Sequence, residues 1–216
     1  MRLFTKKEYK KYYTMRSLHI KNEYTLFEII RMCIWLIKTK FINRKARLIR
    51  FPIVIRGRKY IDMGISLTTG IGCRLEAFSV SGSSDIKIKF GRSVQINDYV
   101  HISAIENVEI GDNVLMASHV YISDNSHGIY SGGVDESSPL IPPKDREYIT
   151  APVKIGKNVW LGEGVIVMPG VEIGDGCVIG AHSIVNKSIP ANCIAVGAPA
   201  KVVKVYSFEE KCWKRI

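Results

Sequence analysis

Residues 155–190 read IGKNVW LGEGVI VMPGVE IGDGCV IGAHSI VNKSIP, which is six consecutive units of six residues. The first and fifth positions of each unit are aliphatic or small. Apolar residues two positions apart, such as Val159 and Leu161, point to the same face of a strand. Strands this short, separated by corners, can bury an apolar face only when successive turns of the chain coil and stack. The sequence therefore predicts a parallel β-helix.

The repeat extends toward the N-terminus in the same pattern. A second array covers residues 110–122, and units that begin at residues 90 and 96 precede it. Fainter copies begin at Ile61, Leu67 and Cys73. Gly, Asn and Asp, which stand between the strands, tolerate the positive φ angles of tight corners. We therefore expect a β-helix domain over the greater part of the chain.

Three parts follow from this pattern. Residues 1–58 are expected to form a basic, largely helical extension, residues 59–205 the β-helix, and residues 206–216 a short tail. Residues 124–153 interrupt the repeat with a stretch rich in Ser, Gly, Pro and charge. An excursion of this length from a solenoid is usually functional.

The basic residues are concentrated near the N-terminus. The net charge is +11, and residues 1–50 carry all of this excess. The apolar stripe of this region has helical spacing; it comprises Leu26, Ile29, Ile30, Cys33, Ile34 and Ile37. Three roles are open: a cap on the end of the β-helix, contact with an anionic membrane, or nucleic-acid binding, for which no fold motif is present. We expect the stripe to pack as a cap, while the basic residues before it face a membrane or an acidic lipid-linked glycan; these are Lys6, Lys7, Lys10, Lys11 and Arg16.

The five cysteines are scattered, with no metal-ligand spacing, as is typical of reduced thiols in the cytoplasm. The most apolar stretch, residues 26–37, is shorter than the roughly 20 residues of a spanning helix and contains Glu28 and Arg31. No cleavable signal pattern is present. We therefore expect a cytoplasmic protein that also makes peripheral contact with the inner membrane.

The six-residue units resemble the [Ile/Leu/Val]-Gly-x-x-x-x hexapeptide of the left-handed β-helix acyltransferases. The stretches QIN at residues 95–97, SDNSHG at 123–128 and GAPAK at 197–201 resemble bacterial sugar O-acetyltransferases of lipopolysaccharide synthesis and the maltose and galactoside enzymes. The resemblance covers roughly residues 60–205. It implies a mainly β fold shaped as a triangular prism, a homotrimer with sites between subunits, acetyl-CoA as the donor, no metal, and a sugar hydroxyl as the acceptor.

His127 is the candidate catalytic residue, because it stands where the repeat gives way to the long excursion. Acyl transfer to an alcohol needs a base, and histidine can take the hydroxyl proton and return it to the leaving thiolate. The resemblance places the family's catalytic histidine at this point. Asp124 either orients the imidazole or serves as a corner residue. Asn97 matches the family asparagine that binds the acceptor sugar, and it could equally form a corner.

The donor residues are implied by the resemblance alone. They are Glu163 near the thioester, Ala181 and Ser183 on the pantetheine arm, Asn186 and Lys187 toward the nucleotide, and Lys201 and Lys204 as phosphate contacts. Lysine side chains at these positions would attract the negatively charged phosphates of CoA. Trp160 is expected to point outward, because its neighbours in the strand point inward.

Other classes of site lack support. There is no GxGxxG fingerprint and no phosphate loop. His101, His119 and His127 do not have the spacing of a zinc site in a β-helix, and His101 and His119 occupy different unit positions. Two alternatives to the sugar O-acetyltransferase remain: an acetyltransferase acting on a nucleotide-linked amino sugar or an antibiotic, and a β-helix scaffold without catalytic activity.

Overall fold

The structure is a computed structural model that describes residues 24–79, 84–130, 132–133 and 135–216. The chain divides into two units, residues 1–31 and 32–216. The basic residues expected to face a membrane, from Lys6 to Arg16, lie outside the described residues.

Helix α2 (Leu26–Ile42) confirms the helical stripe. A capping box begins it: the Thr25 N–H donates to Glu28 Oε2 at 2.8 Å, and the Glu28 N–H donates to Thr25 Oγ1 at 3.3 Å. Within residues 32–216 the stripe is not buried as expected, since the exposed fraction of Ile37 is 61%. The contact with the β-helix is made instead by Thr39, whose hydroxyl accepts the Ile49 N–H at 2.8 Å.

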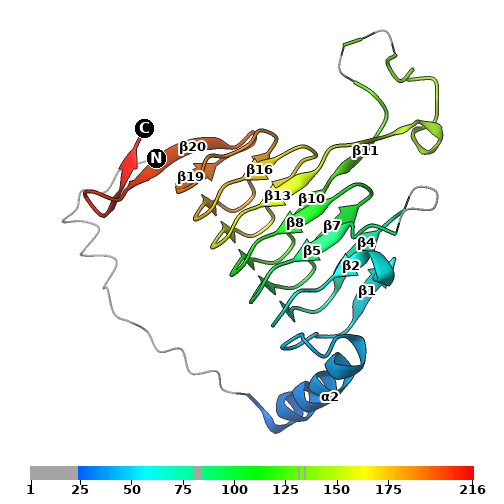
Figure 1. Ribbon diagram of the computed structural model, residues 1–216, viewed down its shortest axis with the longest axis vertical. Coiled ribbons are helices and arrows are strands. Elements are labelled where there is room, and N and C mark those ends of the chain that lie inside the picture. Colours follow the sequence, from blue (N-terminus) through cyan, green and yellow to red (C-terminus); the bar gives the residue numbers. More distant parts are fainter. Residues whose placement is uncertain (1–23, 80–83, 131, 134) are drawn as a thin grey trace. The chain divides into compact units, whose positions relative to one another are not determined.

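Residues 53–196 build a prism of three parallel sheets, here named A, B and C (Figure 1). In spatial order, sheet B contains β1 (Ile53–Arg56), β4 (Cys73–Ala77), β7 (His101–Ala104), β10 (Tyr121–Ser123), β15 (Ile166–Val167) and β18 (Ile184–Val185). Sheet C contains β2 (Ile61–Asp62), β5 (Ile88–Phe90), β8 (Val108–Ile110), β13 (Val153–Ile155) and β16 (Glu172–Ile173). Sheet A contains β3 (Thr68–Thr69), β6 (Gln95–Ile96), β9 (Leu115–Met116), β14 (Trp160–Leu161), β17 (Val178–Ile179), β19 (Cys193–Val196), β20 (Lys201–Ser207) and β21 (Cys212–Arg215). The predicted left-handed β-helix is confirmed.

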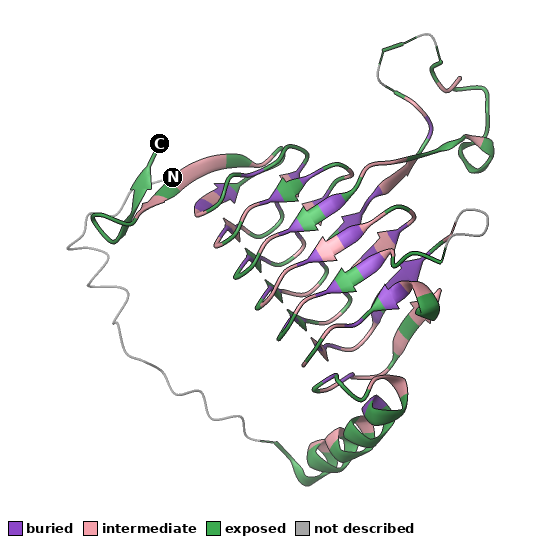
Figure 2. Cartoon of the chain, in the orientation of Figure 1, coloured by how far each residue is buried: buried purple, intermediate pink, exposed green. Residues whose placement is uncertain are grey.

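The first and fifth positions of each unit fill the interior, as the alternation predicts (Figure 2). Val159 and Leu161 are buried, whereas 51% of Trp160 between them is exposed. The outward orientation predicted for Trp160 is therefore confirmed. Each coil lends its strands to the next, so one continuous aliphatic core runs through the prism.

Glycine serves two different purposes in the unit. Gly176, at the fourth position, has φ of 69° and makes the kind of corner that the sequence predicts for the glycines. Gly174, at the second position, does not have positive φ, but a Cβ there would lie 2.4 Å from the backbone N of Ala191 in the next coil. The second-position glycine therefore permits the close approach of coils.

The observed boundaries differ from the expected ones at both ends. β1 pairs with β4, and Leu48 bridges to Thr68, so the coil begins well before residue 59. These rungs were missed because residues 48–56 lack the glycine at the second position. At the other end, β20 and β21 form an antiparallel hairpin on sheet A, so the segment after residue 205 completes this sheet.

The excursion after residue 124 begins and ends as a short hairpin. β11 (Asn125–His127) pairs antiparallel with β12 (Tyr148–Thr150), and a 3₁₀ turn, η2 (Pro143–Asp145), lies between them. The hairpin projects from the coils after β10, an inner strand of sheet B (Figure 1). It holds the first residues of the excursion, His127 among them, against a defined partner strand.

Candidate active site

His127 leaves the coil on a paired strand. Its register partner is Tyr148 of β12, and the two rings lie 4.4 Å apart between centroids at 46°. The Tyr130 hydroxyl donates to the backbone carbonyl of His127 at 2.7 Å. In the described part of the chain, neither imidazole nitrogen of His127 takes part in a hydrogen bond. Both nitrogens are therefore free to exchange a proton with a substrate.

The imidazole lines a cavity of about 700 Å³ on the outer face of sheet B. A cavity of this size is typical of small-molecule sites. Its other lining residues are Arg56, Arg74, Glu76, Phe78, Ser79, Ser103, Ile105, Tyr121, Asn125, Ser126 and Tyr148. The wall thus combines aromatic rings, hydroxyl and amide groups, and two guanidinium groups beside the candidate base.

Of the two roles expected for Asp124, the contacts of its side chain match the corner residue. Its side chain is buried, and its two carboxylate oxygens accept the N–H groups of Ile105, Glu106 and Asn107 at 2.8–3.1 Å. The Asn125 amide adds a fourth donor at 3.0 Å. Asp124 therefore fastens the turn between β7 and β8 and has no hydrogen bond to His127.

The acceptor and donor residues implied by the resemblance do not gather at this cavity within one chain. Asn97 and Glu163 are exposed on the corners that follow strands of sheet A, and Ala181 follows Glu163 one coil later. Asn186 and Lys187 are exposed at the opposite edge of sheet B, after β18. Lys201 and Lys204 lie on β20 of sheet A. None of them is among the residues that line the cavity of His127.

Ser183 departs from its expected role. Its side chain is buried, and its hydroxyl accepts the Gly197 N–H at 3.0 Å. Its carbonyl accepts the Ile166 N–H at 2.9 Å. The side chain of Ser183 therefore holds the coils together and is not presented to a pantetheine arm.

Sheet B carries a charged cluster that the sequence pattern does not predict. Glu76 of β4 lies under Arg74 and His101, with 2.8 Å from its Oε2 to Arg74 Nη2 and to His101 Nε2. Arg56 of β1 approaches Glu76 Oε1 at 3.2 Å. The predicted boundary at residue 58 places Arg56 in the extension, and Arg74-Leu75-Glu76 lies in a faint repeat. The alternation of these three residues, with both charged side chains on the outer face of a strand, is the sequence feature that points to the cluster.

The neighbours of Glu76 favour its ionised form despite its burial. Burial raises the pKa of this carboxyl, but the hydrogen bonds and charges of Arg74 and His101 outweigh burial and hold the pKa below its usual range. His101 therefore binds the carboxylate of Glu76. His119 stacks on Tyr99 at a corner, with 5.1 Å between ring centroids. Among the described residues there is no group of three or more metal-binding side chains.

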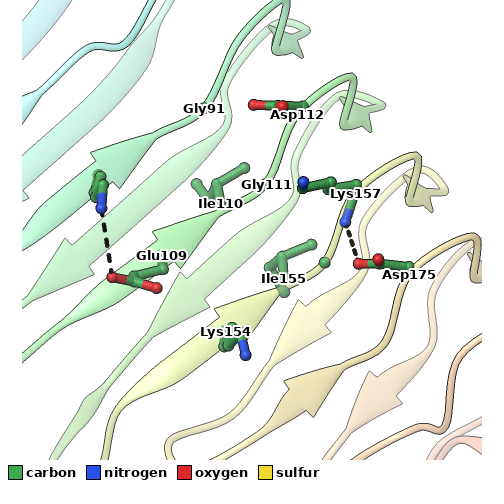
Figure 3. A pocket seen from close by; sticks show the side chains of 11 residues that line it. Gly91, Glu109, Ile110, Gly111, Asp112, Lys154, Ile155, Lys157 and Asp175 are labelled. Carbon is green, nitrogen blue, oxygen red and sulfur yellow. Dashed lines mark hydrogen bonds and ion pairs between the residues drawn. The ribbon is translucent and has the colours of Figure 1, made fainter.

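Sheet C presents a different surface. Its shallow hollow of about 270 Å³ lies over β8 and β13 (Figure 3). Lys89 and Glu109 lie 4.0 Å apart, and Lys154 and Glu172 lie 3.1 Å apart across neighbouring strands. Opposite charges offset one another along this face, and no histidine or cysteine lines the hollow. The cavity beside His127 is therefore the better candidate for chemistry.

The comparisons with known proteins identify the family of the chain. The family model "Bacterial transferase hexapeptide (six repeats)" matches residues 152–187. A lipopolysaccharide biosynthesis O-acetyltransferase of Escherichia coli K12, WbbJ, is 43% identical over 198 residues, which are 92% of this chain and 98% of the relative. The chain belongs to the hexapeptide-repeat acetyltransferases. The predicted family is thereby confirmed.

The fold of this hexapeptide-repeat acetyltransferase is similar to that of solved acyltransferase structures. An N-acyltransferase from Bacillus cereus, AntD, in complex with dTDP-4-amino-4,6-dideoxyglucose and coenzyme A, superposes with a TM-score of 0.63 at 25% identity, covering 77% of this chain and 84% of that one. A galactoside acetyltransferase in complex with coenzyme A has a TM-score of 0.50 at 36% identity and covers 67% of both chains. In the described part of the acetyltransferase, no helix is long and apolar enough to cross a membrane.

Proposed function

We propose that this acetyltransferase moves the acetyl group of acetyl-CoA to a sugar hydroxyl during the synthesis of lipopolysaccharide O-antigen or capsule. The observation that carries the proposal is His127, held on a paired strand at a cavity with both ring nitrogens free. The likeness to WbbJ over nearly its whole length supports a surface polysaccharide as the acceptor.

The reaction needs only a base and a donor of hydrogen bonds. The hydroxyl oxygen attacks the carbonyl carbon of the thioester while His127 takes the hydroxyl proton. Backbone N–H groups stabilise the negative charge on the carbonyl oxygen. When the C–S bond breaks, the imidazolium returns the proton to the thiolate of CoA, which leaves an ester and a free thiol.

The cysteines are poorly suited to an acyl-enzyme. Burial raises the pKa of the Cys73 thiol to about 11, and burial also raises the pKa of Cys177 and Cys193. Cys33 and Cys212 lie on α2 and β21, and no cysteine is among the residues that line the cavity of His127. Direct transfer is therefore the mechanism that these side chains favour.

A homotrimer is part of the proposal. Sheets A and B carry apolar rows on their outer faces, as in Leu115–Trp160–Val178 and Tyr121–Ile166–Ile184, whereas the outer face of sheet C carries paired charges. Apolar outer faces favour contact with partner subunits and charged faces favour water. Assembly would bring Asn97 and the donor residues Glu163, Ala181, Asn186, Lys187, Lys201 and Lys204 to the cavity of a neighbouring chain. Light scattering that gives the mass of a monomer would contradict this arrangement.

Acetylation of candidate acceptors tests the reaction. The protein is incubated with acetyl-CoA and a panel of O-antigen and capsule sugars, including amino sugars, and the products are read by mass spectrometry. We expect a product that gains one acetyl group and loses it in mild alkali, because esters are hydrolysed there and amides are not. An alkali-stable product would favour the amino-sugar alternative that the likeness to AntD suggests. Failure to bind CoA in a calorimetric titration would favour a scaffold.

We also propose that the N-terminal region lies at an anionic membrane surface in the cytoplasm. The exposed fraction of Phe41 on α2 is 86%, and this helix stands in the quarter of the sequence that carries the basic excess. Apolar and basic residues together favour the interface of an anionic bilayer. The protein should therefore co-sediment with vesicles that contain phosphatidylglycerol and not with purely zwitterionic vesicles. Equal sedimentation with both would contradict the proposal.

A further inference from the structure

The cluster on sheet B is built around a buried carboxylate. Only 4% of Glu76 is exposed, although it lies on the outer face of the sheet. Burying a charge is costly unless it is paired and hydrogen-bonded. Glu76 Oε2 meets this condition through the hydrogen bonds with Arg74 and His101, whereas the buried Oε1 has only the ion pair with Arg56 at 3.2 Å and no hydrogen bond to a described residue. The carboxylate therefore acts as a fixed anchor between two arginines.

The contacts with Glu76 do not occupy all the N–H donors of Arg56 and Arg74. A guanidinium has several N–H donors arranged in a plane, and each arginine has one contact with Glu76. The exposed fractions of the two side chains are 63% for Arg56 and 48% for Arg74, and both line the cavity of His127. Each guanidinium therefore keeps free donors that face the space in which an acceptor would lie.

The charges of the cavity do not balance. Glu76 is the one acidic side chain among its lining residues, against the two guanidinium groups. The excess positive charge contrasts with sheet C, where lysines and glutamates pair one to one along the strands. A cavity with surplus guanidinium donors favours an anionic ligand, and phosphate is a group that arginine binds through two N–H donors at once.

The remaining walls suit a sugar. Tyr121 and Tyr148 present aromatic rings. Ser103 lies on β7, between the strand of Tyr121 and the strands of the two arginines, and Ser126 lies on β11 of the hairpin. Aromatic rings pack on the apolar faces of a ligand, and hydroxyl groups fix its orientation. The base, the sugar-binding groups and the cationic groups thus belong to one cavity.

We propose that the acceptor is a sugar linked to a diphosphate, with the phosphates held by Arg56 and Arg74 and the sugar hydroxyl directed to His127. The inference rests on the proposed acetyl transfer and names the class of its acceptor. Glu76 and His101 act as positioning residues that hold the arginines. Both a nucleotide-linked and a lipid-linked sugar have this diphosphate chemistry.

Calorimetric titration of the full chain tests the proposal. CoA is kept at a saturating concentration so that its own phosphates occupy the donor site, and the ionic strength is low because salt screens such contacts. The probes are inorganic pyrophosphate, UDP and geranyl diphosphate. We expect pyrophosphate to bind, and whichever of UDP and geranyl diphosphate binds more tightly identifies the source of the diphosphate.

The variants assign the binding to the arginines. The double change Arg56→Gln and Arg74→Gln should weaken pyrophosphate binding by about tenfold or more. Arg56→Gln alone leaves Glu76 paired with Arg74 and His101, so it keeps the test valid if the double variant fails to fold. Arg92→Gln removes one charge, as Arg56→Gln does, on an exposed corner outside this cavity; it is the matched control for the single variant and should bind as the wild type does.

Three results would overturn the proposal: no binding of pyrophosphate, equal binding by the wild type and the double variant, or an equal loss of CoA affinity in that variant. The last would assign the arginines to the donor. Because the readout is binding in the presence of CoA, its failure would leave acetyl transfer to a neutral sugar intact. If the proposed function were wrong, the wild-type protein would acetylate none of the acceptors.

Discussion

Replacing His127 with alanine should lower kcat/KM for acetyl transfer by about 10²–10⁴-fold, which is the usual contribution of a general base. The hydroxyl would then lose its proton to water at the moment of attack, whereas the donor site would be unchanged. CoA affinity should therefore stay at the wild-type value. The measurements are release of CoA thiol in the presence of the acceptor, and calorimetric titration with CoA.

Two controls separate catalysis from folding. His127 is exposed, so its removal should leave the circular dichroism spectrum and the melting temperature unchanged. Lys144→Ala, which alters an exposed residue of η2 in the same excursion and lies outside the cavity, should retain full activity. Turnover by His127→Ala at the wild-type rate would remove this residue from the mechanism.

The repeat made the fold predictable because the same physical demand recurs in every coil. Val159, Leu161 and their equivalents must point inward, and the chain can satisfy this pattern only by stacking. The position of His127 was predictable as well, since it follows the last regular residue before the excursion. Its free imidazole could not be predicted, because that depends on the pairing of β11 with β12.

The missed features depend on contacts between residues distant in sequence. Glu76 meets Arg56 and His101 because parallel strands bring residues of successive coils side by side. The coil that contains Arg56 lacks the glycine of the repeat, so its place in sheet B was not visible. The apolar stripe of α2 was read correctly as a helix, but helical spacing does not say what covers it; Thr39 makes the contact instead.

Asp124 shows that the position of a residue in a motif does not decide between two roles. It stands three residues before His127, which suggested a carboxylate that orients an imidazole. In the structure its oxygens are consumed by three backbone N–H groups and the Asn125 amide. A buried carboxylate with that many donors holds backbone in place. Its loss should therefore affect stability before chemistry.

Asp124→Ala should destabilise the protein by about 3–5 kcal/mol, because the buried N–H groups of Ile105, Glu106 and Asn107 would lose their acceptor. For a chain of this size the melting temperature should fall on the order of 10 °C, measured at one fixed protein concentration. Asp124→Asn should also be destabilised, since its amide NH₂ would face the donors of Glu106 and Asn107 in place of an oxygen.

Asp175→Ala is the matched control, because Asp175 is exposed and accepts a single backbone N–H, that of Lys157, at 2.7 Å. Its loss should cost about 1 kcal/mol or less. If Asp124→Ala melted at the wild-type temperature and yet lost its turnover, Asp124 would act on the reaction, and the role of the turn between β7 and β8 would have to be given up. The expected result would show that Asp124 stabilises the turn beside the hairpin of His127 and does not contact the substrate.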